Sequence, residues 1–403
     1  MFEISSKENG FVLTRLKPIS FNLCSVITVS GERRATIFKL SSLILFLILL
    51  ISKLHSKELS NNFKNDKSLI LLIGDGMGLP IISAWDYYKK DSIDNKYSIL
   101  DGFDGTFLVR TRSKDKIITD SAAAATAYAT GYNVDNYQVG LINNNQRVKT
   151  IMDLAKDKNK STGIVVLCTL THATPAAFYA YSSKRSDEQF IANQLIYSNI
   201  DVAIGGGHKY FKNLIPKFKQ KGYTILENIY QINELKNNKQ KINEINKLLA
   251  FLSENHPPKQ SERNYKLAEL SELAINLLSK NPNGFFLMIE ASQIDWYGHD
   301  NLFKDQINEM KDYEETIKFL LSYYKTNRNV LILTLGDHDC GGLTLIDYNA
   351  SKFDDNFKIN YSSNYHTSEH IPAFYKGTIN YQIKPIVNNT EIFYIMKSFL
   401  IDN

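Results

Sequence analysis

The sequence of 403 residues contains only three cysteines, Cys24, Cys168 and Cys340. So few cysteines over this length exclude a small scaffold built from disulfides. Hydrophobic residues make up 43% of the chain and charged residues 22%, values close to those of globular proteins. We therefore expect a packed core, in two or three domains or in one large α/β domain with insertions.

An excess of basic residues is also missing. The formal net charge is +5, and residues 1–53 alone carry +4 of it, so residues 54–403 are left with about +1. A domain that binds nucleic acid usually shows a clear basic excess. The balance predicts no nucleic-acid binding.

The sequence has one continuous long apolar run, residues 40–51, which follows Arg33, Arg34 and Lys39. This pattern resembles the hydrophobic part of a secretory signal and is short for a membrane span of roughly 20 residues. Counted as residues 35–54, the segment approaches spanning length, so a signal anchor stays open. A buried core helix would need a surrounding domain, whereas residues 56–67 are polar. We predict a leader over 1–53 with a signal peptide or anchor, a linker over 54–67, and export to the periplasm or the medium, free or membrane-anchored.

Short apolar runs rich in Val, Ile, Leu and Phe recur along the rest of the chain. They lie at residues 69–73, 106–109, 163–167, 202–204, 285–289, 330–335 and 371–375. Helix-like stretches at 150–158, 187–197 and 305–324 separate them. Continuous apolar strands that alternate with helices predict an α/β three-layer sandwich with a central, mostly parallel sheet over residues 68–403. The Lys- and Asn-rich stretch near 228–266 is interpreted as a polar surface excursion from this domain.

Acidic residues and histidines follow three of these runs: Asp75, Glu290, Asp337 and His338. The carboxyl ends of parallel strands form the ligand site of open α/β sheets, so these groups should converge. Asp295 and His299 add a pair spaced i, i+4, which lies on one face of a helical turn. A single such Asp is most often a cap or turn residue, and a single His most often has no ligand. Together they indicate a metal site, because converging carboxylates repel unless cations lie between them. Carboxylates with imidazoles suit zinc, and carboxylates with hydroxyl groups suit magnesium.

A serine precedes an alanine-rich helix in TDSAAAAT (119–126). Ser121 can be read as the N-cap of that helix, because serine caps well and alanine is the best helix former. It can equally be a nucleophile, because a helix N-terminus stabilises an alkoxide and binds phosphate. No GxSxG motif surrounds it, which disfavours a serine hydrolase triad and favours activation by a metal ion.

Six blocks in order resemble the alkaline phosphatase family over most of residues 68–380. They read IGDGMG (73–78), TDSAAAAT (119–126), THATPAAFYAYSSKR (171–185), MIEASQIDWYGHD (288–300), TLGDHDCGG (334–342) and HTSEHIPAF (366–374). The resemblance implies hydrolysis of small phosphate monoesters through a phosphoserine on Ser121. It also implies that Asp120 braces Arg185, which holds two phosphate oxygens, and that the protein is a homodimer.

The same resemblance implies two zinc ions and one magnesium ion. One zinc would be held by Asp295, His299 and His366, the other by Asp75, Asp337 and His338, and magnesium by Asp75, Thr174 and Glu290. Of the two histidines in HTSEHIPAF, the offset to the next strand matches His366, rather than His370, to the family ligand. His172 and Trp296 depart from the best-known bacterial pattern and are expected to tune the site.

Two other functions remain open at this point. A phosphodiesterase or phosphomutase of the same superfamily would share the two-metal core, although such relatives generally lack the combination of Arg185, Thr174 and Glu290. A catalytically inactive surface protein stabilised by metal is the other, although no expected ligand is missing.

Overall fold

The structure is a computed structural model that describes residues 66–89, 98–142, 146–348 and 357–402. The chain divides into two units, residues 1–64 and 65–403. The predicted leader and most of the predicted linker lie outside the described residues. Within the described ranges, no helix combines the length and the apolar character needed to cross a membrane.

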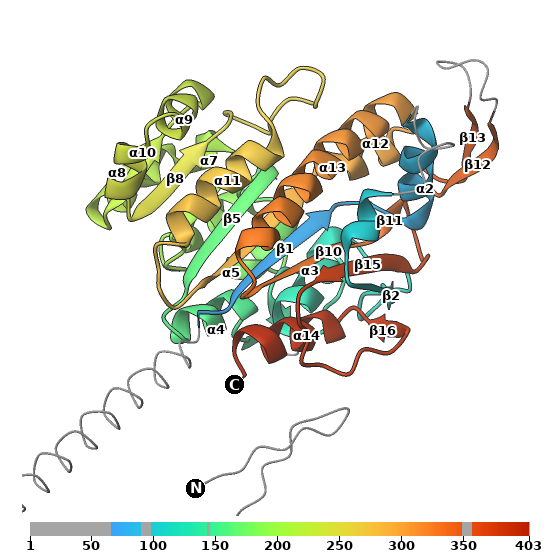
Figure 1. The fold of residues 1–403 in the computed structure, drawn as a ribbon, viewed down its shortest axis with the longest axis horizontal. Helices are drawn as coiled ribbons and strands as arrows, with labels where there is room; N and C mark the ends of the chain where they lie inside the picture. The colour runs from blue at the N-terminus through green and yellow to red at the C-terminus, as the bar shows by residue number, and fades with distance from the viewer. Residues whose placement is uncertain (1–65, 90–97, 143–145, 349–356, 403) are drawn as a thin grey trace, which may run out of the picture. The chain divides into compact units, whose positions relative to one another are not determined.

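A ten-stranded sheet forms the centre of the second unit (Figure 1). All seven predicted apolar runs are strands of this sheet. In spatial order its strands are β16 (Ile386–Asn388), β2 (Gly105–Arg110), β15 (Ile371–Lys376), β10 (Val330–Gly336), β1 (Ser68–Gly74), β9 (Phe285–Ala291), β5 (Ser161–Thr169), β6 (Val202–Gly206), β8 (Lys247–Phe251) and β7 (Tyr223–Leu226). β15 runs antiparallel to both of its neighbours and all other pairs are parallel, which confirms a mostly parallel sheet.

Three two-stranded ribbons accompany the large sheet. They pair β11 (Asp339–Cys340) with β14 (His366–Thr367), β12 (Leu343–Tyr348) with β13 (Phe357–Tyr361), and β3 (Leu141–Ile142) with β4 (Gln146–Arg147). The β11–β14 ribbon matters most for function, because it places His366 opposite Cys340.

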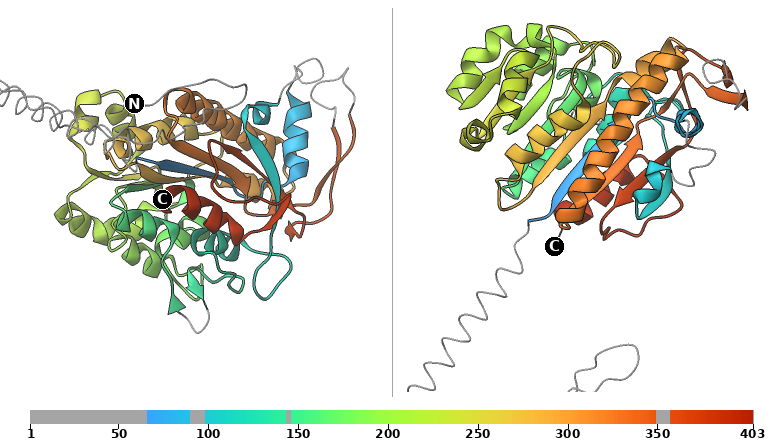
Figure 2. Two further views of the ribbon diagram at one scale, coloured as in Figure 1. Left: turned by 60° about the horizontal axis from the view of Figure 1, so that its bottom comes forward. Right: turned by 45° about the horizontal axis from the view of Figure 1, so that its top comes forward.

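Strand β1 shows why the fold has three layers. All seven of its residues are buried, and successive side chains point to opposite faces of the sheet. Leu69, Leu71 and Ile73 join one apolar cluster, whereas Ile70 and Leu72 join another. Helices must therefore cover both faces, which confirms the predicted sandwich (Figures 1 and 2).

The helices divide between these two clusters. The face of Leu71 is covered by α3 (Ser121–Thr130), α4 (Ile151–Asp157), α5 (Ala173–Tyr179), α6 (Glu188–Leu195), α7 (His208–Phe211), α8 (Ile215–Gln220) and α14 (Glu391–Leu400). The face of Leu72 is covered by α2 (Leu79–Tyr88), α9 (Ile229–Lys236), α10 (Lys239–Glu244), α11 (Leu267–Leu278), α12 (Gln293–His299) and α13 (Phe303–Thr326). The predicted helical stretches 150–158, 187–197 and 305–324 correspond to α4, α6 and α13.

The structure corrects the interpretation of residues 228–266 as a surface excursion. Lys247–Phe251 is strand β8, which pairs with β6 and β7 inside the main sheet. In the loop beyond it, Arg263 has a fully buried side chain that contacts Glu309 at 2.6 Å and Asp312 at 2.9 Å on α13. Polar composition misled the prediction, because a short apolar strand was embedded in it and because a paired charge can be buried.

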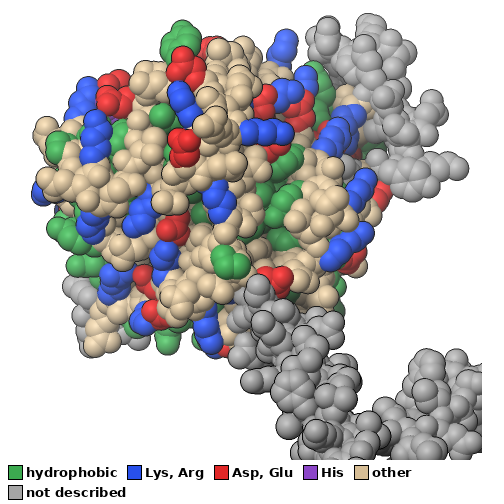
Figure 3. Space-filling model, turned by 60° about the vertical axis from the view of Figure 1, so that its left-hand side comes forward, with side chains coloured by type: hydrophobic (Ala, Val, Ile, Leu, Met, Phe, Trp, Pro, Cys, Tyr) green, Lys and Arg blue, Asp and Glu red, His purple; other side chains and the backbone are tan. Residues whose placement is uncertain are grey.

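Helices α9 and α10 of the same stretch do lie at the edge of the domain. On the face of the molecule that includes this edge, basic and acidic side chains are interspersed (Figure 3). Lys236 of α9, for example, pairs with Glu269 of α11.

Candidate active site and metal centre

The metal-ligand candidates from three neighbouring strands lie at one edge of the sheet. Strand β1 lies between β10 and β9, with Gly74 opposite Gly336 and Ile73 opposite Glu290. Asp75 therefore follows β1 at the same level at which Asp337 follows β10. Both side chains are fully buried, as is that of Glu290. The prediction that these strand ends converge is confirmed.

A first cluster joins Asp295 and His299 of α12 to His366 of β14, with Cys340 also close. The Nε2 atoms of the two histidines lie 3.1 Å apart, and each lies 3.4 Å from a different oxygen of Asp295. The Nδ1 atoms lie 2.7 and 2.8 Å from the main-chain carbonyls of Asn364 and Thr119.

These carbonyls can only accept, so each Nδ1 donates and each neutral ring turns its Nε2 lone pair toward Asp295. Two lone pairs and a carboxylate facing one another need a proton or a cation between them. In the absence of a cation, the hydrogen bond to Asp295 raises the pKa of His299 to about 9. The arrangement could therefore hold a metal ion.

A second cluster contains Asp75, Asp337 and His338. The His338 Nε2 lies 3.2 Å from Asp337 Oδ2 and 3.6 Å from Asp75 Oδ1. Main-chain N–H groups of Gly76 and His338 donate to Asp337 Oδ1, whereas Asp337 Oδ2 and both oxygens of Asp75 are buried without a hydrogen bond. Burial and the neighbouring Asp337 charge raise the pKa of Asp75 well above its usual value, and burial raises that of Asp337 to about 7. These carboxylates are positioned to gain from a divalent cation.

A third cluster surrounds Glu290 on β9. Its carboxyl lies with Cys168 of β5 and His172, the residue that precedes α5. Thr174 of α5 is also fully buried, and its hydroxyl makes no hydrogen bond. Burial raises the pKa of Glu290. The structure thus adds a thiol, from Cys168, to the predicted neighbourhood of this site.

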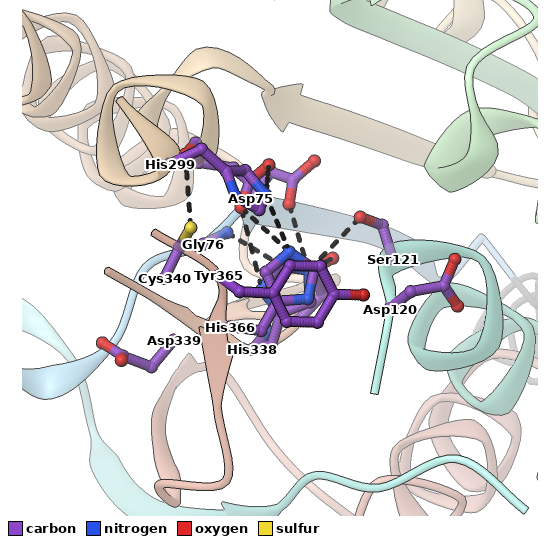
Figure 4. Close-up of polar contacts among 12 residues, drawn as sticks. Asp75, Gly76, Asp120, Ser121, His299, His338, Asp339, Cys340, Tyr365 and His366 are labelled. Carbon is purple, nitrogen blue, oxygen red and sulfur yellow. Dashed lines mark hydrogen bonds and ion pairs between the residues drawn. The ribbon is translucent and has the colours of Figure 1, made fainter. Parts of the chain in front are cut away.

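The nucleophile candidate Ser121 is the first residue of α3, and the N-cap is Asp120. Asp120 Oδ1 accepts from the Ala123 N–H at 3.0 Å, so the hydroxyl of Ser121 takes no part in capping. Its Oγ instead lies 3.2 Å from His338 Nε2 (Figure 4). The alternative reading of Ser121 as a cap is wrong, because the neighbouring aspartate fills that role.

Arg185 lies beside the same helix end. Its Nη1 donates to Asp120 Oδ2 at 2.9 Å, and its Nη2 lies 3.2 Å from His172 Nε2. The main-chain N–H of Arg185 donates to the carbonyl of Tyr137, whose own N–H donates to Asp120 Oδ1. Asp120 therefore caps α3 and holds the guanidinium through different oxygens, as expected for a residue that braces Arg185.

Aromatic rings line the site, and two of them, Tyr365 and His256, were not predicted from the sequence. Tyr365 stacks on His366, which stacks on His338 with centroids 3.5 Å apart (Figure 4). The rings of His256 and Trp296 meet edge to face at 4.7 Å, and His172 lies 6.2 Å from Trp296. His256 lies in the polar loop after β8, where no motif marks it.

Comparison with known proteins agrees with this geometry. The family model described as alkaline phosphatase matches residues 66–347. The chain belongs to the alkaline phosphatase family. Membership makes it an enzyme of the phosphoric-monoester hydrolase class, in a family that depends on metals.

Relatives of this alkaline phosphatase chain include alkaline phosphatase 4 of Bacillus subtilis, 35% identical over 315 residues. That alignment covers 73% of this chain and 67% of the relative. Among solved structures, the alkaline phosphatase of the Antarctic bacterium TAB5 is 31% identical, with a TM-score of 0.75. The match covers 84% of this chain and 98% of the TAB5 chain. A TAB5 variant with one histidine replaced by glutamate has Mg bound in its M3 site; it shows 30% identity, a TM-score of 0.74 and the same coverage.

Proposed function

We propose that this protein hydrolyses phosphate monoesters to an alcohol and inorganic phosphate through a phosphoserine on Ser121. The observation that carries the proposal is the position of the Ser121 hydroxyl. It lies at the N-terminal end of α3, 3.2 Å from His338 in the second cluster and next to the residue that holds Arg185. A nucleophile, a phosphate-binding guanidinium and buried metal ligands thus meet at one point.

The residues of the three clusters fit divalent cations. Buried polar atoms normally have partners, yet unpartnered oxygens occur in every cluster, on Asp295, Asp75, Asp337 and Glu290. We assign one zinc to Asp295, His299 and His366 and a second to Asp75, Asp337 and His338. A third ion belongs at Asp75, Thr174 and Glu290, where the family resemblance implies magnesium. When bound, the ions supply positive charge that lowers the pKa of the attacking hydroxyl and stabilises the transferring phosphoryl group.

The chain's own residues orient the substrate. Arg185 offers two parallel N–H donors to two phosphate oxygens, and its pairing with Asp120 fixes the plane of this fork. The main-chain N–H groups at the start of α3 that Asp120 does not bind would donate to the same phosphate, and the helix dipole would add favourable charge. Both features position the phosphorus in front of Ser121.

The reaction then takes two displacements. Ser121 Oγ bonds to phosphorus while the bond to the alcohol oxygen breaks, and the alcohol leaves with a proton. Water next attacks the phosphoserine from the opposite side, which restores the Ser121 hydroxyl and releases inorganic phosphate. Because the residues act mainly by position and charge, many alcohols should serve as leaving groups.

Export and assembly belong to the same proposal. The apolar run of residues 40–51 supports export to the periplasm or the medium, and the family resemblance supports a homodimer. The proposed site residues are those inferred from the sequence, with His172 in the third cluster and Trp296 beside it.

The decisive assay is hydrolysis of p-nitrophenyl phosphate by the full chain, before and after exhaustive chelation. We expect chelation to abolish turnover and zinc with magnesium to restore it. Activity that survives complete metal removal would contradict the metal-dependent mechanism. Absence of activity in fully loaded protein would favour the inactive surface protein instead.

A further inference from the structure

The third cluster contains a sulfur atom that the proposed magnesium ligands do not include. Cys168 lies near the end of β5, the strand that pairs with β9 and brings Val166 opposite Glu290. Its Sγ lies 3.3 Å from both Glu290 Oε2 and the main-chain carbonyl of Thr169, either of which can accept the thiol proton. One ligand atom from each of Cys168, His172 and Glu290 lies within 4.8 Å of the other two. This spacing allows all three to bind one ion.

Polar atoms around this point are buried without partners. Glu290 Oε1, Thr174 Oγ1 and His172 Nδ1 make no hydrogen bond, and Glu290, Thr174 and Cys168 are fully buried. A buried carboxylate oxygen and a buried ring nitrogen left unpaired each carry a cost in free energy. Their convergence beside a thiol indicates a ligand that all of them contact.

The chemistry of these donors selects the ion. Magnesium requires oxygen ligands in a near-octahedral shell, whereas a cysteine sulfur with an imidazole and a carboxylate suits zinc and its close analogues. We infer that the third ion of this protein is a thiophilic divalent cation such as zinc, rather than the magnesium that the family resemblance implies, and that Cys168 and His172 join Glu290 as its ligands. On binding, the thiol proton, which Glu290 or the Thr169 carbonyl accepts, is released to solvent and a sulfur–metal bond forms. The inference rests on the proposed function in treating this cluster as part of the same active site.

The hydrogen bond between His172 and Arg185 bears on the same inference. Arg185 Nη2 can only donate, so the contact to His172 Nε2 puts the ring proton on Nδ1, where nothing accepts it. An ion bound at Nδ1 moves that proton to Nε2, which then no longer accepts from Arg185. The guanidinium keeps its bond to Asp120 and is free to turn its second N–H group toward phosphate.

Cys340 is a matched control within the same protein. It is the other buried thiol among the described residues, and its Sγ donates to the main-chain carbonyl of Asp295 at 3.4 Å beside the first cluster. With Cys24 replaced by serine in every protein compared, a sulfur–metal signal can be assigned by replacing Cys168 or Cys340 with serine, one at a time.

The experiment loads metal-free full-length protein with cobalt(II) and records its absorption spectrum. Three proteins are compared in the Cys24→Ser background: wild type at the other two cysteines, Cys168→Ser and Cys340→Ser. We expect a thiolate-to-cobalt charge-transfer band in the wild type, retained in Cys340→Ser and lost in Cys168→Ser. Absence of the band in the wild type, or its loss only in Cys340→Ser, would overturn the inference.

A second measurement guards against a Cys168→Ser protein that does not fold. X-ray absorption on zinc-loaded Cys340→Ser should show a zinc–sulfur distance of about 2.3 Å. Zinc coordinated by nitrogen and oxygen atoms alone would rule out Cys168 as a ligand. Neither reading depends on turnover, so a protein that hydrolyses p-nitrophenyl phosphate but lacks the sulfur signal refutes this inference and leaves the proposed function standing.

Discussion

Replacing Ser121 by alanine should separate chemistry from structure. The hydroxyl makes one contact, to His338 Nε2, and does not cap α3. Removing this one hydrogen bond should cost about 1 kcal/mol of stability or less, since alanine is the best helix former and favours α3. Turnover of p-nitrophenyl phosphate should nevertheless fall by more than about a thousandfold, as expected when a nucleophile is removed.

The neighbouring substitution Asp120→Ala is the matched comparison. It removes the helix cap, worth about 1 kcal/mol, and it leaves Arg185 without its partner. Breaking a buried ion pair costs roughly 3–5 kcal/mol, and partial exposure of the Arg185 side chain reduces that figure. We therefore expect a total loss of at least about 2 kcal/mol, clearly more than for Ser121→Ala.

Urea unfolding of the metal-free proteins measures the two stabilities without a contribution from bound ions. Rapid acid quenching with phosphorus-labelled substrate should trap label on the wild type and none on Ser121→Ala. A loss of stability in Ser121→Ala as large as that in Asp120→Ala, or turnover by Ser121→Ala within tenfold of the wild type, would refute the role of Ser121 as the nucleophile.

Three further outcomes are expected. Arg185→Ala should reduce kcat/KM for p-nitrophenyl phosphate far more than for bis-p-nitrophenyl phosphate, because only a monoester offers the dianion that the guanidinium fork matches; equal losses would show that Arg185 does not recognise it. His366→Ala should lose one zinc and most activity, since His366 is buried against Asp295, whereas His370→Ala should change little; metal analysis giving the reverse would reassign the ligand. Burial lowers the pKa of Lys160 from its ordinary value of 10.5 to about 8. Between these two pH values the folded chain binds fewer protons than the unfolded chain, so the free energy of unfolding should increase with pH. In Lys160→Met, urea midpoints measured below pH 8 and between about pH 8 and 10.5 should show a smaller increase with pH. An unchanged slope would contradict the lowered pKa of Lys160.

The sequence was most informative where one physical cause dominated. Apolar runs marked seven strands of the sheet, and the acids that follow three of these runs converge in the structure as predicted. Strand β8 was missed because five residues in a polar stretch give a weak signal, and because the burial of Arg263 depends on acids of a distant helix. Ser121 and Asp120 both cap helices well, so only the backbone conformation decided between them.

Cys168 was missed for a different reason. A lone cysteine at the end of an apolar strand is typical of a core residue, and its proximity to Glu290 arises from pairing between strands more than a hundred residues apart in the sequence. His256 similarly reaches Trp296 from a loop with no motif. Contacts of this kind follow from tertiary structure, which local patterns do not encode.

The complete burial of α3 limits how the segment that carries Ser121 can vary. All ten of its residues are buried, four consecutive alanines among them, so the helix has no solvent-facing side that could accept a change. Larger side chains at residues 122–125 would overpack their surroundings at a cost of roughly 1–3 kcal/mol each, and glycine would cost about 1 kcal/mol in helix propensity. In a library of random variants this stretch should accept little besides alanine and serine, including at positions that touch no substrate. Sequence conservation in this helix would then reflect the small space available for its side chains as well as the role of Ser121 in the reaction.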